Sequence, residues 1–108
     1  MPAEDTKHSI HQALVNRLRH GPGHAQAEQR ARAFDNAEAP QPLRALLEKV
    51  ATQSAHVTDA DFAAAMEAGF TDDQLFELVI CAAVGQATRQ YDAGLAALAE
   101  ATADAEST

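Results

Sequence analysis

Residues 57–75 read VTDADFAAAMEAGFTDDQL, and this stretch contains two helix-start patterns of the same kind. In the first, VTDADF, Thr58 can cap the amides of the following turn while Asp61 stands at the reciprocal position. In the second, FTDDQL, the same spacing separates Thr71 from Gln74. Each pattern predicts that a helix begins immediately after its threonine.

Gly69 lies between the two patterns, where a helix commonly ends with a residue in the left-handed conformation. A short helix is therefore predicted over 59–68 and a long one from residue 72 onward. Sustained period-two alternation is absent from the sequence and β-branched residues are sparse, so no strand is predicted.

Upstream, PLRALLEKVATQSA begins at Pro42, a residue suited to a first helical turn. The stretch places its apolar residues on one helical stripe, namely Leu43, Leu46, Leu47, Val50 and Ala51. The preceding NAEAPQP is expected to be a linker.

Two further helices are predicted near 5–19 and 25–35, separated by the turn sequence HGPGH at 20–24. The first carries Ile10, Leu14 and Leu18 at helical spacing. In the second only Phe34 is large and apolar, so this helix is expected to lie on the surface or dock on a neighbour.

The long helix from residue 72 is apolar on two sides. One side carries Leu75, Val79 and Ala82, and the other carries Phe76, Ile80, Ala83, Ala87, Tyr91, Leu95 and Leu98. A helix that is apolar on two sides is expected to be surrounded by protein. Because the chain is short and much of its apolar content is alanine, we expect the second face to meet another subunit.

The 108 residues are enough for one domain. The net charge of −8 argues against binding to nucleic acid or to an anionic membrane surface. One cysteine excludes an intramolecular disulfide. The sequence shows no signal-peptide pattern and no apolar run of about 20 residues, so a cytoplasmic location is expected.

The segment from PLRALLEKVA through HVTDADFAAAMEAGFTDDQLFELVICAAVGQATRQYDAGLAAL, residues 42–98, resembles the helical module of the carboxymuconolactone decarboxylase and alkylhydroperoxidase (AhpD-like) superfamily. The resemblance lies in the helix layout and the small residues that follow FTDDQLFELV, then Arg89 and GLAAL. It implies an all-α, multi-helix bundle that assembles as trimers, hexamers or similar rings.

The resemblance does not carry over the peroxidase site of that family, which has Cys-x-x-Cys-x-x-x-His on one helix. Counted from Cys81, the second cysteine position holds Val84 and the histidine position holds Thr88. In an alternative alignment, residues 42–98 correspond to the part of the fold that follows the redox helix, and Cys81 was never a catalytic position.

Three residues of the long helix are candidates for a catalytic site. Glu77 could act as a general base or form an ion pair with an arginine such as Arg44 or Arg89. Cys81 is expected to be a buried structural thiol, because Glu77 lies one turn away and raises the thiol pKa. Arg89 could hold an anionic ligand at a subunit boundary or form a structural salt bridge. Tyr91 is expected to pack its ring.

The five histidines do not form a recognisable metal-binding pattern, and HExxH is absent. His8 and His11 share one side of the first helix, and His20 and His24 flank the Gly-Pro-Gly turn. His56 precedes the helix start at Thr58 and inherits no role from the family. Neither a metal nor a cofactor is predicted.

The chain is therefore interpreted as N-terminal helices and a linker over 1–41, the AhpD-like module over 42–98, and an acidic tail over 99–108 that is expected to fray. The favoured function is a non-catalytic homo-oligomer with an accessory, protein-interaction or small-ligand role, such as binding a small anion. The alternatives are a peroxidase-like enzyme that uses Cys81, a decarboxylase-like enzyme that uses Glu77 and Arg89, and a ligand sensor.

Overall fold

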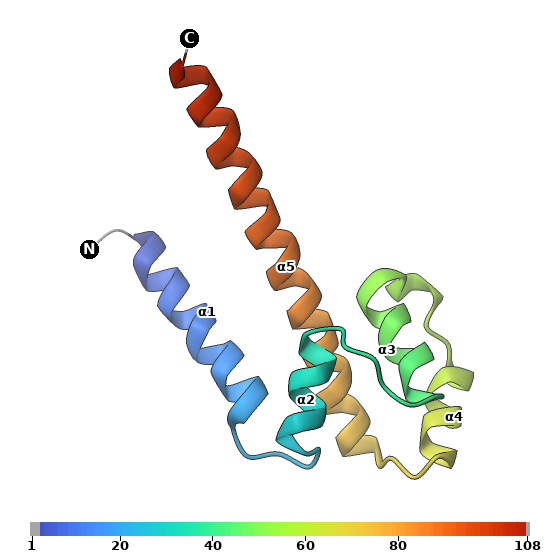
Figure 1. Ribbon diagram of the computed structural model, residues 1–108. Helices are drawn as coiled ribbons and strands as arrows, with labels where there is room; N and C mark the ends of the chain where they lie inside the picture. Colours follow the sequence, from blue (N-terminus) through green and yellow to red (C-terminus); the bar gives the residue numbers. More distant parts are fainter. Residues whose placement is uncertain (1–2, 108) are drawn as a thin grey trace.

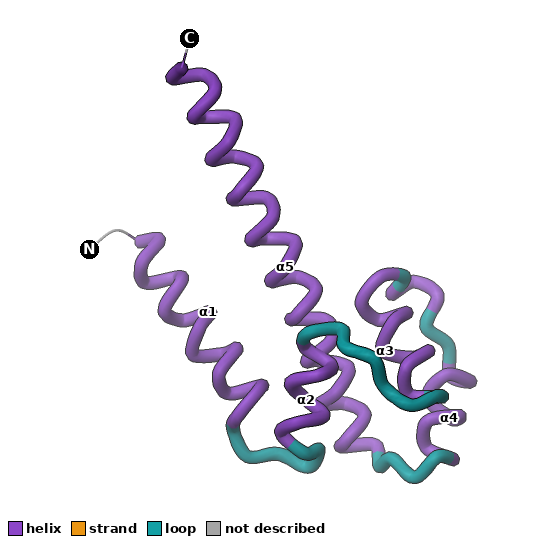
Figure 2. Tube along the Cα trace, viewed as in Figure 1, coloured by secondary structure: helices purple, strands orange, loops and turns teal. Residues whose placement is uncertain are grey.

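A computed structural model of the chain describes the backbone of residues 3–107 and the side chains of residues 6–104 (Figure 1). The described residues are all helical or loop, as predicted, with no strand among them (Figure 2). The elements are α1 (Ala3–His20), α2 (Ala27–Phe34), α3 (Leu43–Thr52), the 3-10 helix η1 (Ser54–His56), α4 (Asp59–Glu67) and α5 (Asp72–Ser107).

The two helix starts predicted at Thr58 and Thr71 are confirmed. At the start of α5, the Thr71 hydroxyl accepts a hydrogen bond from the Gln74 amide at 3.2 Å, and the Gln74 side chain accepts one from the Thr71 amide at 3.0 Å. At the start of α4, Asp61 Oδ2 accepts from the Thr58 amide at 2.9 Å. Gly69 follows α4 with φ of 111°, the conformation predicted there.

Asp61 also joins α4 to α3, because Lys49 Nζ donates to its Oδ1 at 2.9 Å. The Lys49 ammonium and the Thr58 amide together lower the pKa of Asp61 below its usual value. The same side chain therefore closes the helix start and helps to fix the angle between α3 and α4.

The core lies where α2, α3 and α4 meet the first half of α5 (Figure 1). Leu46, Leu75, Leu78 and Cys81 are the largest side chains that are completely buried in it. The apolar stripe predicted for α3 is confirmed, since four of its five residues are buried and Val50 packs against the core. Residues of α1 and α2 belong to the same core as those of α3, α4 and α5.

Of the two positions expected for α2, on the surface or docked on a neighbour, the structure shows the second. Among the described helices, α2 makes the most extensive contact with α5, and it buries Arg30, Ala33 and Phe34. The two helices approach closely at Gly85 of α5, where a Cβ would overlap the carbonyl oxygen of Phe34. Phe34, the one large apolar residue of α2, is thus buried together with Ala33 and with the charged Arg30.

Two expectations, one about the apolar stripe of the first helix and one about the end of the last helix, differ from the structure. In α1, only Leu18 of the predicted stripe packs against the core, while Ile10 and Leu14 are exposed and Val15 is buried instead. At the other end of the chain, residues 99–107 of the expected fraying tail are helical, as part of α5.

The C-terminal end of α5 extends beyond the other helices (Figure 1). Every residue from Gln90 to Asp104 is exposed, including Tyr91, which was expected to pack its ring. The radius of gyration is 16.8 Å, whereas a compact domain of this length has about 13 Å. None of the described helices combines the length and the apolar character needed to cross a membrane.

Candidate functional site

The sequence-predicted candidates Glu77, Cys81 and Arg89 lie along α5, on the part that packs against α1 and α2. Each of them contacts the backbone of the N-terminal helices or of the loop between them. The structure therefore places all three at one helix contact, but each has its own set of partners.

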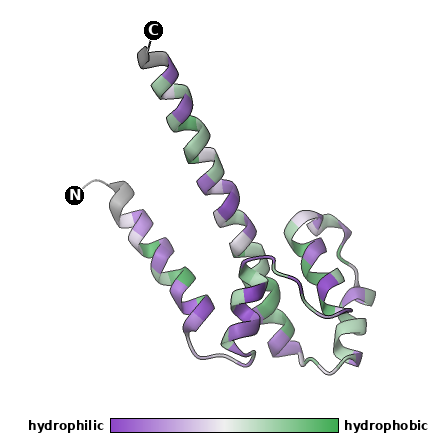
Figure 3. Cartoon of the chain, in the orientation of Figure 1, coloured by the Kyte–Doolittle hydropathy of each residue, from purple (hydrophilic) through white to green (hydrophobic). Residues whose placement is uncertain are grey.

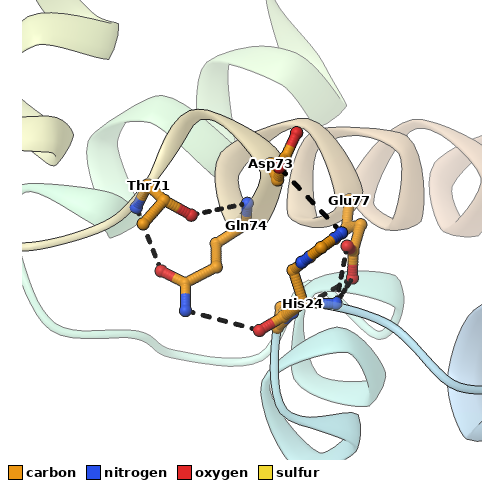
Figure 4. A network of polar contacts seen from close by, with 6 residues as sticks. His24, Thr71, Asp73, Gln74 and Glu77 are labelled. Atoms are coloured by element: carbon orange, nitrogen blue, oxygen red, sulfur yellow. Dashed lines mark hydrogen bonds and ion pairs between the residues drawn. The ribbon is translucent and has the colours of Figure 1, made fainter.

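Glu77 binds the loop between α1 and α2 through backbone amides (Figure 4). Its two carboxylate oxygens accept hydrogen bonds from the His24 amide at 2.7 and 2.9 Å, and Oε1 also accepts from the Ala25 amide at 3.1 Å. Gly23 makes this approach possible, because a Cβ at that position would overlap the carboxylate. The Gly-Pro-Gly turn thus leaves room for the Glu77 side chain of α5, which follows more than fifty residues later in the sequence.

Two neighbouring residues of α5 support the same loop (Figure 4). The Gln74 side chain donates to the His24 carbonyl at 3.4 Å, and Asp73 lies 3.9 Å from His24 Nε2. The loop is therefore held by consecutive turns at the start of α5.

Within one copy, Glu77 pairs with neither Arg44 nor Arg89, the two arginines named as examples, although the charge of Arg30 acts on it. Arg44 pairs with Glu38 at 2.7 Å, and Arg89 donates to the Phe34 carbonyl and to Gln86. Burial by itself raises the pKa of Glu77, but the amides of Ala25 and His24 and the charge of Arg30 outweigh it. The pKa therefore lies below its usual value, which is the opposite of what a general base at neutral pH requires.

Arg30 of α2 is a site residue that the sequence analysis did not identify. It is 5% exposed and donates three hydrogen bonds to backbone carbonyls. These reach Ala25 at 3.2 Å, Leu18 at 3.0 Å, and Gly21. Arg30 and Glu77 thus hold the backbone of residues 18–25 from two sides, and we call these two side chains with that segment the loop clamp.

Cys81 is completely buried, as its apolar neighbours predict. Its Sγ lies 3.7 Å from the Leu18 carbonyl, next to the loop clamp. Burial raises the pKa of the thiol, the charge of Arg30 opposes this, and Glu77 adds to it. A thiol with a raised pKa and no exposure is a poor nucleophile, because the thiolate is the reactive form.

Arg89 closes the C-terminal end of α2. Its guanidinium donates to the carbonyl of Phe34, the last residue of that helix, and to the Gln86 side chain at 2.9 Å. A cation at this position also interacts favourably with the helix dipole. The predicted salt bridge is replaced by this cap, and the guanidinium is already engaged by protein groups rather than presented to an anion.

Two surface hollows in the described part of the chain are lined by other residues. One, of about 360 Å³, lies between α4 and α5 and is apolar except for one carboxylate, with Phe62, Met66, Asp72, Leu75, Phe76 and Val79 around it. The other, of about 220 Å³, lies between α2, α3 and the linker that joins them. Neither is lined by Glu77, Cys81 or Arg89.

The histidines are spread over the described helices and loops. His11 shares a 3.0 Å hydrogen bond with the Thr88 hydroxyl, which joins α1 to α5. Within the part of the chain that the structure describes, no three His, Cys, Asp or Glu side chains gather closely enough to hold a metal ion.

The loop clamp makes a pH-dependent contribution to stability. Because the folded-state pKa of Glu77 lies below the ordinary 4.5, the contribution is fully present above that pH and is lost as the pH falls through the folded-state pKa. We expect Glu77→Gln to lower the free energy of unfolding at pH 7 by about 2 kcal/mol, because hydrogen bonds to a charged acceptor are lost.

The measurement is urea denaturation of wild type and variant at pH 7 and pH 3, at one chain concentration. The difference between the two proteins should shrink at pH 3. Glu67→Gln is the control, because Glu67 is exposed on α4, and it should change stability by less than about 0.5 kcal/mol. Equal effects of Glu77→Gln at both pH values would contradict the assigned role.

No protein-family model, curated protein or solved structure matches this chain.

Proposed function

We propose that this chain is a non-catalytic, self-associating helical protein of the carboxymuconolactone decarboxylase-like type, whose copies cover the exposed apolar face of α5. The observation that carries the proposal is the apolar stripe along α5, which consists of Phe76, Ile80, Ala83, Ala87, Tyr91, Leu95 and Leu98. Its function is then to present a helical surface or a small-ligand site at the boundary between copies.

The stripe keeps to one side of the helix, because its members are three or four residues apart. Phe76 is 66% exposed, Tyr91 is 64% exposed and Leu98 is 63% exposed. Figure 3 shows apolar positions recurring along the exposed second half of α5, whose C-terminal end reaches beyond the other helices of the chain. Contiguous apolar surface of this kind is typical of interaction sites in soluble proteins.

The length of α5 supports the same proposal. Its 36 residues span about 54 Å. Helices of this kind gain most of their stability from packing an apolar face, and an isolated stretch is marginal in water. Gly94, in the exposed part, weakens the helix further by about 1 kcal/mol relative to alanine. A partner that buries the stripe would supply the missing stabilisation.

The contacts of the three candidate residues support a non-catalytic role. A peroxidase-like enzyme needs Cys81 as a thiolate, and a decarboxylase-like enzyme needs Glu77 and Arg89 free for a substrate. Cys81 is buried, Glu77 is occupied by two backbone amides, and Arg89 caps α2. The proposed family membership would place the copies in a trimer, a hexamer or a similar ring.

Sedimentation velocity at micromolar chain concentration tests the proposal. Wild type should sediment as a species larger than the 11.5 kDa chain. The double variant Tyr91→Asp/Leu98→Asp should dissociate to monomers, because each carboxylate would have to be buried in an apolar interface.

The matched control is Ala93→Asp/Ala96→Asp, which adds the same charge at exposed positions on the opposite side of the same helix. It should retain the wild-type assembly. A wild-type chain that sediments as a monomer at micromolar concentration would overturn the proposed function.

A further inference from the structure

The larger of the two hollows, which we call the α4–α5 hollow, has an apolar floor and apolar walls. Leu75 is 1% exposed and forms the floor, and Phe62 and Val79 are partly buried beside it. Met66 is 46% exposed and Phe76 is 66% exposed, so these two side chains form the rim. The volume of about 360 Å³ falls within the range of small-molecule sites, about 300–1,000 Å³.

One charged group lines this hollow, the carboxylate of Asp72. Asp72 and Asp73 both lie in the first turn of α5, where the helix dipole favours carboxylates, but only Asp72 borders the hollow. Asp73 faces His24 at 3.9 Å, whereas the Asp72 side chain forms no ion pair in the described part of the chain. Its carboxylate is therefore available to a cation that enters from solvent.

The two helix segments that form the hollow carry carboxylates and no cationic side chain. Residues 57–88, which contain α4 and the first half of α5, include six Asp and Glu and no Lys, Arg or His. In the described part of the chain, the ammonium of Lys49 is the one cation that forms an ion pair with α4, and it is held by Asp61. A concave surface whose charges have one sign concentrates ions of the opposite sign. The hollow therefore favours a positively charged ligand.

We propose that the α4–α5 hollow binds a small organic cation, an ammonium group carried on one aromatic ring or on a short branched alkyl chain. The apolar part of the ligand lies against Leu75, Phe62 and Phe76, and its ammonium group pairs with Asp72. Two phenylalanine rings suit such a ligand, because an ammonium near an aromatic ring is attracted by the π electrons. Met66 is flexible and adapts to the shape of the apolar part.

The other hollow, between α2, α3 and the linker, has no unmatched charge of this kind. Its cation Arg32 and its carboxylate Glu28 lie 3.8 Å apart, so each is matched by the other. Its volume of about 220 Å³ is also below the range given above. Of the two hollows, the α4–α5 hollow is therefore the one whose charge selects a ligand.

The inference goes beyond the proposed function, because a single copy supplies every group that contacts the ligand. Phe76 is the one residue that the hollow shares with the apolar stripe. The site therefore opens beside the contact proposed between copies, and binding is measured both in wild type and in the Tyr91→Asp/Leu98→Asp variant.

NMR titration of the ¹⁵N-labelled protein with three probes tests the location and the charge. The probes are phenethylamine, phenethyl alcohol and phenylacetate, which share a ring and end in a cationic, a neutral and an anionic group at pH 7. The amine should shift the amide signals of α4 and of the first turns of α5. It should bind about fivefold more tightly than the alcohol, and phenylacetate should give no saturable shift. Equal affinities for amine and alcohol, or shifts confined to the other hollow, would overturn the inference.

Asp72→Asn tests the carboxylate. It should weaken binding of the amine by about fivefold and leave binding of the alcohol unchanged, which a merely structural role of the side chain would not do. Asp73→Asn is the matched control, because it removes the same charge from the adjacent position, which does not line the hollow. It should change the affinity for the amine by less than about twofold. Equal effects of the two variants on the amine would contradict the assigned pair.

Phe76→Ala tests the apolar wall and should weaken binding of amine and alcohol alike, by about fivefold. Because Phe76 is exposed, its removal should leave the fold intact, which circular dichroism verifies. Leu95→Ala is the control, since Leu95 is an exposed apolar residue of the same helix outside the hollow. Both are made in the Tyr91→Asp/Leu98→Asp background, so that assembly does not differ between them. An unchanged affinity in Phe76→Ala would contradict the site.

The outcome is distinguishable from that of the proposed function. If the amine binds and wild type sediments as a monomer, the proposed function is wrong and this inference stands. If the Tyr91→Asp/Leu98→Asp variant binds the amine but assembled wild type does not, another copy fills the hollow, and the inference is wrong while self-association stands.

Discussion

Gly85→Ala is expected to lower the free energy of unfolding by at least about 3 kcal/mol, or to prevent folding. Gly85 is the point where α5 crosses the C-terminal end of α2, and an added Cβ would overlap the carbonyl oxygen of Phe34. The obstacle is backbone rather than the end of a flexible side chain, so relief requires moving one helix against the other. Moving them would also pull the Phe34 carbonyl away from Arg89.

Gly94→Ala is the matched control, because it makes the same substitution in the same helix. No atom lies within 4 Å of a Cβ built at this position. The change should therefore keep or raise the helix content, since alanine is favoured over glycine in a helix by about 1 kcal/mol. Thermal and urea unfolding followed by circular dichroism measure both variants. A Gly85→Ala protein as stable as the Gly94→Ala protein would contradict the close approach of α2 and α5.

Arg30→Met is expected to lower the free energy of unfolding by about 3 kcal/mol or more. The substitution keeps an unbranched side chain of similar length but removes the donors to the carbonyls of Leu18, Gly21 and Ala25. It also removes the positive charge beside Glu77. Because these carbonyls lie at the end of α1 and in the loop that follows it, hydrogen exchange of the α1 amides should accelerate more than that of α3.

Two variants separate the parts of this effect. Arg30→Lys keeps the charge but lacks the planar arrangement of donors, so it should recover only part of the lost stability. Arg32→Met changes an exposed arginine of the same helix and should cost less than about 0.5 kcal/mol. Equal losses from Arg30→Met and Arg32→Met would show that the loop clamp contributes nothing specific.

Self-association makes the measured stability depend on chain concentration. All variants are therefore compared at one concentration, and the Gly85 and Arg30 variants are also examined in the Tyr91→Asp/Leu98→Asp background. Their destabilisation should persist there, because both residues act within one copy. This separates the packing of α2 on α5 from the proposed contact between copies.

The helix boundaries could be predicted because they depend on neighbours in the sequence. The pairs Thr58–Asp61 and Thr71–Gln74 close hydrogen bonds over three residues, and Gly69 adopts its conformation without help from distant groups. The apolar stripe of α3 follows from helical spacing in the same way. Interactions of this kind involve residues only a few positions apart, so they can be predicted from the sequence alone.

The partners of the candidate residues could not be predicted in the same way. Glu77 was expected to need an arginine, and it meets the amides of His24 and Ala25 because the Gly-Pro-Gly turn brings backbone to the start of α5. Arg30 could not be identified as a buried residue, since a single arginine in a polar helix forms no recognisable sequence motif. Whether a charge is buried depends on which segments pack over it.

What the sequence by itself determined is the set of helices, where α4 and α5 begin, and the presence of one apolar stripe more than this chain can cover. Only the tertiary structure decided which face of α1 is buried, that α2 lies against Gly85, and which groups hold Glu77 and Arg30. The physical reason is the range of the interactions. Caps and stripes connect residues within one or two turns, whereas the loop clamp connects groups about fifty residues apart, whose meeting depends on every helix between them.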